Sequence, residues 1–146
     1  MILSPHFTLA ELSASEVAER HGANNTPPER VLPALIYLAQ NLEAVRSLLG
    51  HYPVHINSGY RSERTNVLVG GREFSQHTRG EAVDFIVPRA GTPFELCTVI
   101  AQSPLPFDQL IYEFSWVHIS FTTRRVPRRS ILTIRGSHTW AGLVQR

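Results

Sequence analysis

The sequence predicts a single α+β domain, residues 1–146, in which N-terminal helices pack on one face of an antiparallel sheet. Apolar residues recur at helical spacing in the first third of the chain, and short runs with β-strand character fill the second half. A length of 146 residues with 42% hydrophobic and 18% charged residues is typical of one folded domain rather than a disordered chain.

The first helices are indicated by capping boxes, in which a hydroxyl and a carboxylate satisfy free backbone amides at a helix N-terminus. Residues 8–11 and 13–16 both fit this pattern, so we expect two short helices there. Both should end near Gly22, because glycine adopts the conformation that follows a helix most easily.

A longer helix is expected after Thr26, with that residue as its cap and Pro27 at its first position. Pro33 should bend the first turn or delay its start. Gly50 is expected to end this helix. Its apolar positions form one stripe at helical spacing: Val31, Leu35, Leu38, Leu42, Val45 and Leu49.

The rest of the chain alternates between predicted strands and loops, with one further helix. The residues at 114–115 separate two β-rich runs, which predicts a hairpin with a two-residue turn. The expected elements are a strand at 54–57, a polar loop at 61–80, a strand at 82–87, a helix begun by a capping box at 92–95 and ended by Pro104, hairpin strands at 108–113 and 116–121, and a last strand at 130–135.

Composition excludes several classes of protein. The single cysteine, Cys97, excludes an intrachain disulfide and a Cys-rich zinc finger. The longest apolar run, Val31 to Ala39, is too short for membrane insertion. The start of the sequence lacks a basic region followed by an apolar stretch, so we expect synthesis in the cytoplasm without a signal peptide. The net charge of +2 only weakly indicates an anionic polymer as partner.

The stretch from Ser75 to Asp84 carries the most informative pattern. His77 is expected on a loop and Asp84 inside the strand that follows, on the face opposite to Phe85 and Val87. Ala82 shares the face of Asp84, and its small side chain would leave room for a metal ion beside the carboxylate. The predicted hairpin adds Glu113, Trp116 and His118 on one face, if residues 114–115 form the turn.

Two histidines and one aspartate form a zinc site whose fourth position is open. A nearby carboxylate, here Glu113, can accept the proton of a water molecule and pass it to a leaving amine. Arg61 offers a rigid donor fork for a developing oxyanion or for a substrate carboxylate. A structural ion pair with Glu63, Glu73 or Glu81 is the alternative role of Arg61.

The pattern Ser-x-His-x-x-Gly-x-Ala-x-Asp followed by Trp-x-His resembles the zinc D-Ala-D-Ala metallopeptidases, metallopeptidase family fifteen. The wider group includes lysostaphin-like enzymes and the hedgehog signalling domain. The segments at 58–62 and 69–71 also look like this family, as does the N-terminal segment, which is similar to small phage and prophage members. The resemblance runs from Leu3 to about Phe121, with the catalytic motifs within 58–121.

The resemblance implies that His77, Asp84 and His118 bind Zn²⁺ and that the substrate is the peptidoglycan stem peptide. It implies that Glu113 is the catalytic acid/base and that Arg61 is an electrophilic or substrate-binding residue. Candidate substrate contacts are Ser75, Tyr60 and Trp116. Many relatives place the catalytic glutamate three residues before the second histidine, where this chain has Ser115.

Several functions stay open at this point. Within the family, the reaction is that of a D-Ala-D-Ala carboxypeptidase or of an endolysin-type endopeptidase that reaches the wall after holin-type release. The alternative is a non-catalytic, zinc-containing wall-binding or phage virion module. A third reading, a nucleic-acid binder that uses the arginines of residues 124–129, has no nucleic-acid motif beside it. We expect a monomer with neither nucleic-acid binding nor membrane insertion.

Overall fold

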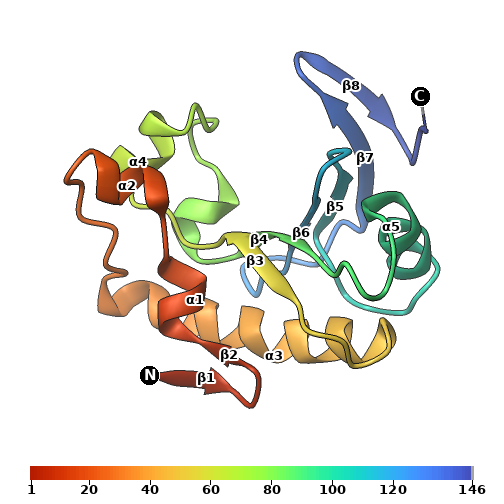
Figure 1. Ribbon diagram of the computed structural model, residues 1–146, viewed down its shortest axis with the longest axis horizontal. Helices are drawn as coiled ribbons and strands as arrows, with labels where there is room; N and C mark the ends of the chain where they lie inside the picture. The colour runs from red at the N-terminus through yellow and green to blue at the C-terminus, as the bar shows by residue number, and fades with distance from the viewer. Residues whose placement is uncertain (146) are drawn as a thin grey trace.

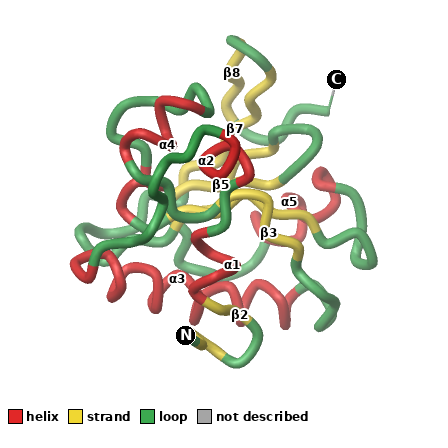
Figure 2. Tube along the Cα trace, turned by 60° about the vertical axis from the view of Figure 1, so that its left-hand side comes forward, coloured by secondary structure: helices red, strands yellow, loops and turns green. Residues whose placement is uncertain are grey.

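The computed structural model describes residues 1–145, and it confirms the predicted α+β class. Figures 1 and 2 show the arrangement. In chain order the elements are β1 (Ile2–Ser4), β2 (Phe7–Thr8), α1 (Leu9–Ser13), α2 (Glu16–Arg20), the 3₁₀ turn η1 (Glu29–Val31), α3 (Leu32–Leu48), β3 (His55–Ser58), α4 (Glu63–Leu68), the 3₁₀ turn η2 (Gln76–Arg79), β4 (Ala82–Ile86), α5 (Pro93–Ala101), β5 (Gln109–Tyr112), β6 (Val117–Ser120), β7 (Ser130–Arg135) and β8 (His138–Ala141).

The main sheet has the strand order β3-β4-β6-β5-β7-β8. The expectation of an antiparallel sheet is wrong at one pair, because β5 and β7 run parallel. The end of β6 lies beside the start of β5, and residues 121–129 return the chain there before β7 begins. β7 therefore pairs with the free edge of β5 in the same direction. Together with β8 it extends beyond the rest of the fold, at the end away from α3 (Figures 1 and 2).

The sheet has an apolar face and a face that carries polar side chains. Val83 and Phe85 of β4 and Ile119 of β6 are fully buried in the core cluster. The predicted apolar stripe belongs to the same cluster, with Leu35, Leu38, Leu42 and Val45 on α3, Val31 just before this helix and Leu49 just after it. α5 contacts β5, β6 and α3, so α3 and α5 cover this face. Within residues 1–145, no helix is long and apolar enough to cross a membrane.

Two N-terminal details differ from the prediction. The box at Thr8 caps α1 as expected, but α2 is capped by Ser15, whereas Ser13 donates its hydroxyl to the Leu9 carbonyl within α1. The long helix begins at Leu32 rather than directly after Thr26, which confirms the delayed start expected from Pro33. A proline ring is tolerated only in the first turn of a helix, so Pro33 fixes where α3 can start.

The segment predicted as a polar loop at 61–80 contains α4 and η2. Ser62 caps α4 by accepting a hydrogen bond from the Thr65 amide, and Ser75 caps η2 in the same way from His77. Strands β1, β2 and β8 were also not expected. These elements are short, and short segments carry little hydrophobic periodicity. The box at Thr92 and the bounds of β7 are confirmed.

Gly80 is the residue that lets η2 pack against α3. Its φ of +71° lies in the left-handed region, and a Cβ built there would lie 3.0 Å from the Leu35 side chain. We expect Gly80→Ala to lower the free energy of unfolding through both backbone strain and crowding.

Gly22→Ala is the matched control, because Gly22 has a φ of +61° with nothing within 4 Å of its Cβ position. The left-handed backbone alone costs roughly 1–2 kcal/mol, and crowding in a packed site adds about 1–3 kcal/mol. Urea unfolding should therefore show a larger loss for Gly80→Ala than for Gly22→Ala. Equal losses would show that η2 does not pack on α3 in this way.

Candidate metal centre

Three donor side chains meet on the polar face of the sheet. Asp84 of β4 and His118 of β6 are register partners, and His77 approaches them from η2. His77 Nε2 lies 3.4 Å from Asp84 Oδ2, and His118 Nδ1 lies 3.0 Å from Asp84 Oδ1. All three residues are buried, and one donor atom from each lies within 4.8 Å of the others. The group is thus positioned to hold a metal ion.

A hydrogen bond to the backbone fixes the orientation of the His77 ring. Its Nδ1 lies 2.8 Å from the Gly59 carbonyl oxygen, which can only accept, so Nδ1 carries the proton and donates it. Burial lowers the pKa of His77, which favours the neutral ring. A neutral ring protonated at Nδ1 presents the lone pair of Nε2 to its other neighbour, as a metal-binding histidine does.

The donor set fits a divalent cation. The lone pair of His77 Nε2 faces Asp84 Oδ2 at 3.4 Å, and two acceptor atoms at this separation repel each other unless a cation lies between them. Burial alone would raise the pKa of Asp84, but the hydrogen bond with His118 outweighs burial and holds this pKa well below its usual range. Asp84 is therefore an anion wherever the protein is folded near neutral pH.

Arg61 also contacts this carboxylate. Its Nη2 lies 3.3 Å from Asp84 Oδ2, while Nε donates to the Ser58 hydroxyl and Nη1 to Asn66 Oδ1. Burial lowers the pKa of Arg61, and the charges of Asp84 and Glu113 oppose that effect. Among the ion pairs of the described residues, Arg61 pairs with Asp84 and with none of the three glutamates considered from the sequence.

The hairpin places Glu113 beside the three donors, in the register that the sequence predicts. Ile111 lies opposite His118, and the Glu113 amide donates to the Trp116 carbonyl across the turn. Trp116 Nε1 in turn donates to Glu113 Oε2 at 2.9 Å. Burial raises the pKa of Glu113, as does the charge of Asp84, against the opposing effects of His118, Trp116 and Arg61.

The other candidate substrate contacts have different surroundings. Ser75 is occupied as the cap of η2. Tyr60 is buried in the core cluster and lines a groove of about 1120 Å³ that includes none of the three donors. Trp116 is half-buried beside Glu113. A contact of these residues with substrate stays a prediction.

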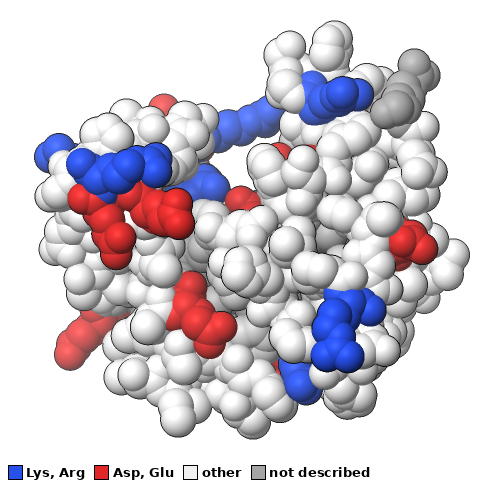
Figure 3. Space-filling model, in the orientation of Figure 1, with Lys and Arg blue, Asp and Glu red and all other residues white. Residues whose placement is uncertain are grey.

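One face of the molecule is concave. In the orientation of Figure 1, it is hollowed between the part that carries α4 and the part that carries β7 and β8. Basic and acidic side chains are both visible inside this hollow (Figure 3).

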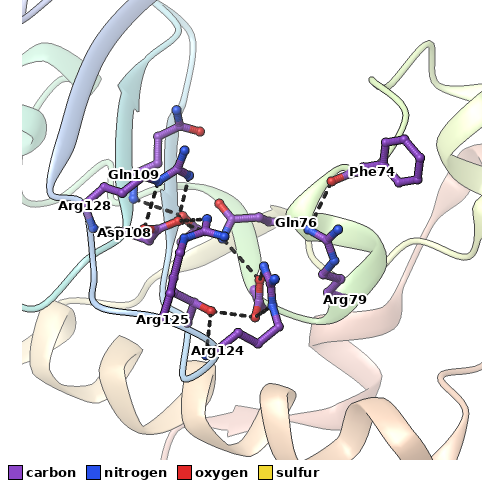
Figure 4. Close-up of polar contacts among 11 residues, drawn as sticks. Phe74, Gln76, Arg79, Asp108, Gln109, Arg124, Arg125 and Arg128 are labelled. Carbon is purple, nitrogen blue, oxygen red and sulfur yellow. Dashed lines mark hydrogen bonds and ion pairs between the residues drawn. The ribbon is translucent and has the colours of Figure 1, made fainter.

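The arginines of residues 124–129 form ion pairs that the sequence analysis missed. Arg124 pairs with Glu81, and Arg125 and Arg128 both pair with Asp108 (Figure 4). Arg129 donates to the carbonyls of Ala101 and Ser103 at the end of α5. Both carboxylates are almost completely buried. No local sequence pattern links Glu81 and Asp108 to arginines so distant in the sequence. The position of Asp108, between the apolar Phe107 and a predicted strand, was a weak signal of a buried ion pair.

The comparisons with known proteins assign the family. A family model described as Peptidase M15 matches residues 5–120, and the chain therefore belongs to the peptidase M15 family. A comparison with curated proteins finds no match. Peptidases of this family depend on zinc, in agreement with the His-Asp-His group, and membership supports a metallopeptidase that acts on a peptide substrate.

The buried Asp108 predicts a specific sensitivity to acid. Burial would raise its pKa, but hydrogen bonds from Arg128 and Arg125 outweigh burial and hold the pKa well below its usual range. The folded state thus binds the Asp108 proton less tightly than the unfolded state does. The resulting stabilisation is complete above the unfolded-state pKa of about 3.9 and is lost as the pH falls below it.

We expect the free energy of unfolding to depend less steeply on pH in Asp108→Asn than in the wild type between about pH 5 and pH 2. The difference in slope should be at most about 1.4 kcal/mol per pH unit for one proton. Urea unfolding across this range measures it, with Glu19→Gln, at an exposed position, as the control. Parallel curves for wild type and Asp108→Asn would contradict the assignment.

Proposed function

We propose that the chain hydrolyses a peptide bond of the bacterial peptidoglycan stem peptide with the help of a bound zinc ion. The observation that carries this proposal is the position of Glu113, whose pKa responds to Asp84 and His118, beside a His-Asp-His group in a member of the peptidase M15 family. Such stem peptides lie outside the cytoplasmic membrane, so the proposal places the action of the chain at the cell wall.

The residues divide the work of hydrolysis between them. Zinc held by His77, Asp84 and His118 would supply Lewis-acid chemistry, polarising a carbonyl and making water more acidic. Glu113 accepts the proton of the attacking water as the new C–O bond forms. It then delivers that proton to the amine nitrogen as the C–N bond breaks. A raised pKa brings this carboxyl closer to neutral pH, where both transfers are efficient.

Trp116 and Arg61 hold their partners in place for these steps. The indole donates to Oε2 of Glu113, so the carboxylate plane is oriented and Oε1 is the atom left to exchange the proton. Ser58, Asn66 and Asp84 fix the Arg61 guanidinium from different directions. A fixed cation in this hollow suits the oxyanion that develops on the scissile carbonyl, or the terminal carboxylate of a D-Ala-D-Ala end.

The displaced glutamate favours a second candidate function. Glu113 does not stand three residues before His118, and a two-residue turn separates it from Trp116. A module that has the fold and the metal but binds the wall without cleaving it would also tolerate this displacement. The two functions differ in what Glu113 does, so the decisive variant is a change at this residue.

The test is mass spectrometry of purified peptidoglycan after digestion with the zinc-loaded chain. We expect new fragments whose termini identify the bond, and we expect none from Glu113→Gln or from chelated protein. Glu113→Gln keeps the size of the side chain and its ability to accept a hydrogen bond from Trp116. Loss of activity would therefore assign the proton transfer to the carboxylate. A synthetic peptide that ends in D-Ala-D-Ala separates the two reactions, since only a carboxypeptidase releases free D-Ala from it.

Glu16→Gln, at an exposed position on α2, is the control and should keep full activity. Absence of fragments from several wall chemistries, with zinc bound, would reject the peptidase proposal. The wall-binding module would then be the better account. Fragments produced equally by Glu113→Gln would leave the peptidase in place but reject Glu113 as its acid/base.

A further inference from the structure

Gln76, the residue before His77, bridges two buried carboxylates. Its Nε2 donates to Glu81 Oε1 at 3.2 Å and to Asp108 Oδ2 at 3.1 Å (Figure 4). Glu81 follows η2, and Asp108 precedes β5. The side chain next to a metal-donor residue is therefore tied to two separate parts of the fold.

Arginines from one segment neutralise both carboxylates. Arg124 binds Glu81 with two hydrogen bonds, from Nε at 2.9 Å and from Nη2 at 3.0 Å. Arg128 and Arg125 approach Asp108 Oδ2 at 2.7 and 2.8 Å. These three arginines lie beyond the residues that the family model matches. Their guanidinium groups are committed to internal partners, which argues against a role for this segment as a free basic surface.

The backbone connects the same parts. The Glu81 amide donates to the Gln76 carbonyl and closes η2, while the Glu81 carbonyl accepts from the Phe121 amide just after β6. The Thr122 hydroxyl donates to Glu81 Oε2 at 2.9 Å. The turn that carries His77 is thus held by its main chain and by its side chains against the segment that follows β6.

We propose that Gln76 is a positioning residue for the metal centre, and that Gln76, Glu81, Asp108 and the arginines at 124, 125 and 128 form a brace that sets the direction of the His77 ring. The proposal rests on the proposed function in that His77 is taken as a ligand of the metal. The brace fixes η2, η2 places the His77 Nδ1–H against the Gly59 carbonyl, and Nε2 is thereby aimed at Asp84 before any metal binds.

Gln76 is the member of the brace that can be tested without a large loss of stability. Removal of an arginine would leave a buried charge without its partner and could unfold the chain. Gln76 is neutral, and each carboxylate keeps its arginines when the amide is removed. Gln76→Leu therefore removes the bridge and leaves the ion pairs in place. Gln40→Leu, at an exposed position of α3, is the matched control.

The experiment measures two properties of Gln76→Leu. Residues that orient metal ligands typically contribute about 10–100-fold to metal affinity, so the dissociation constant for zinc, from competition with a chromogenic chelator, should rise at least about tenfold. In the metal-free protein, NMR should show faster solvent exchange of the His77 Nδ1–H. Gln40→Leu should change neither property. If Gln76→Leu does not fold, Gln76→Asn, whose shorter side chain cannot reach both carboxylates, should show the same two effects.

An unchanged zinc affinity together with an unchanged His77 Nδ1–H signal would overturn the brace. A wild-type chain that binds no zinc would instead overturn the proposed function. The exchange rate of the His77 proton would still test the brace in that case, because it needs neither metal nor turnover. Faster thermal unfolding or lower stability alone, with both properties unchanged, would count against the brace as well.

Discussion

A carboxylate buried on the face of a β-sheet needs neighbours that carry positive charge or donate hydrogen bonds, and Asp84 is such a group. Asp84 belongs to β4, which lies between β3 and β6, so water cannot reach the carboxylate through an edge of the sheet to donate these hydrogen bonds. Arg61 and His118 supply these contacts from separate segments, and His77 approaches the same carboxylate from η2. Three local features bring these partners together: the cap of α4, the left-handed turn at the end of η2, and the register between β4 and β6.

Two carboxyl groups on the same face have opposite environments, which suits them to different roles. The hydrogen bond with His118 keeps Asp84 ionised, whereas burial and the charge of Asp84 make Glu113 hold a proton more readily. Pairs of acids whose pKa values are pushed apart in this way are typical of sites in which one group binds and the other transfers protons. The β5–β6 hairpin creates the environment of Glu113, because it places this residue beside the metal-donor group and lets Trp116 donate a hydrogen bond to it.

Features that depend on local physics could be predicted from the sequence. The apolar stripe of α3, the boxes at Thr8 and Thr92 and the hairpin register follow from side chains within a few residues of each other. The convergence of His77, Asp84 and His118 could be anticipated because the motif has fixed spacing. The parallel pairing of β5 with β7 and the partners of Glu81 and Asp108 could not, since they join residues as far as 43 positions apart. Helix α4 was missed because its six residues carry no apolar stripe that distinguishes it from a loop.

X-ray absorption spectroscopy on the chain loaded with one equivalent of zinc shows directly whether two imidazoles and one carboxylate hold the metal ion. We expect nitrogen and oxygen ligands at about 2.0–2.2 Å, with the scattering pattern of two imidazole rings and the loss of one ring in His118→Ala. A thiolate ligand at about 2.3 Å, which Cys97 would have to supply, or a coordination sphere of oxygen atoms without imidazole, would contradict this ligand set.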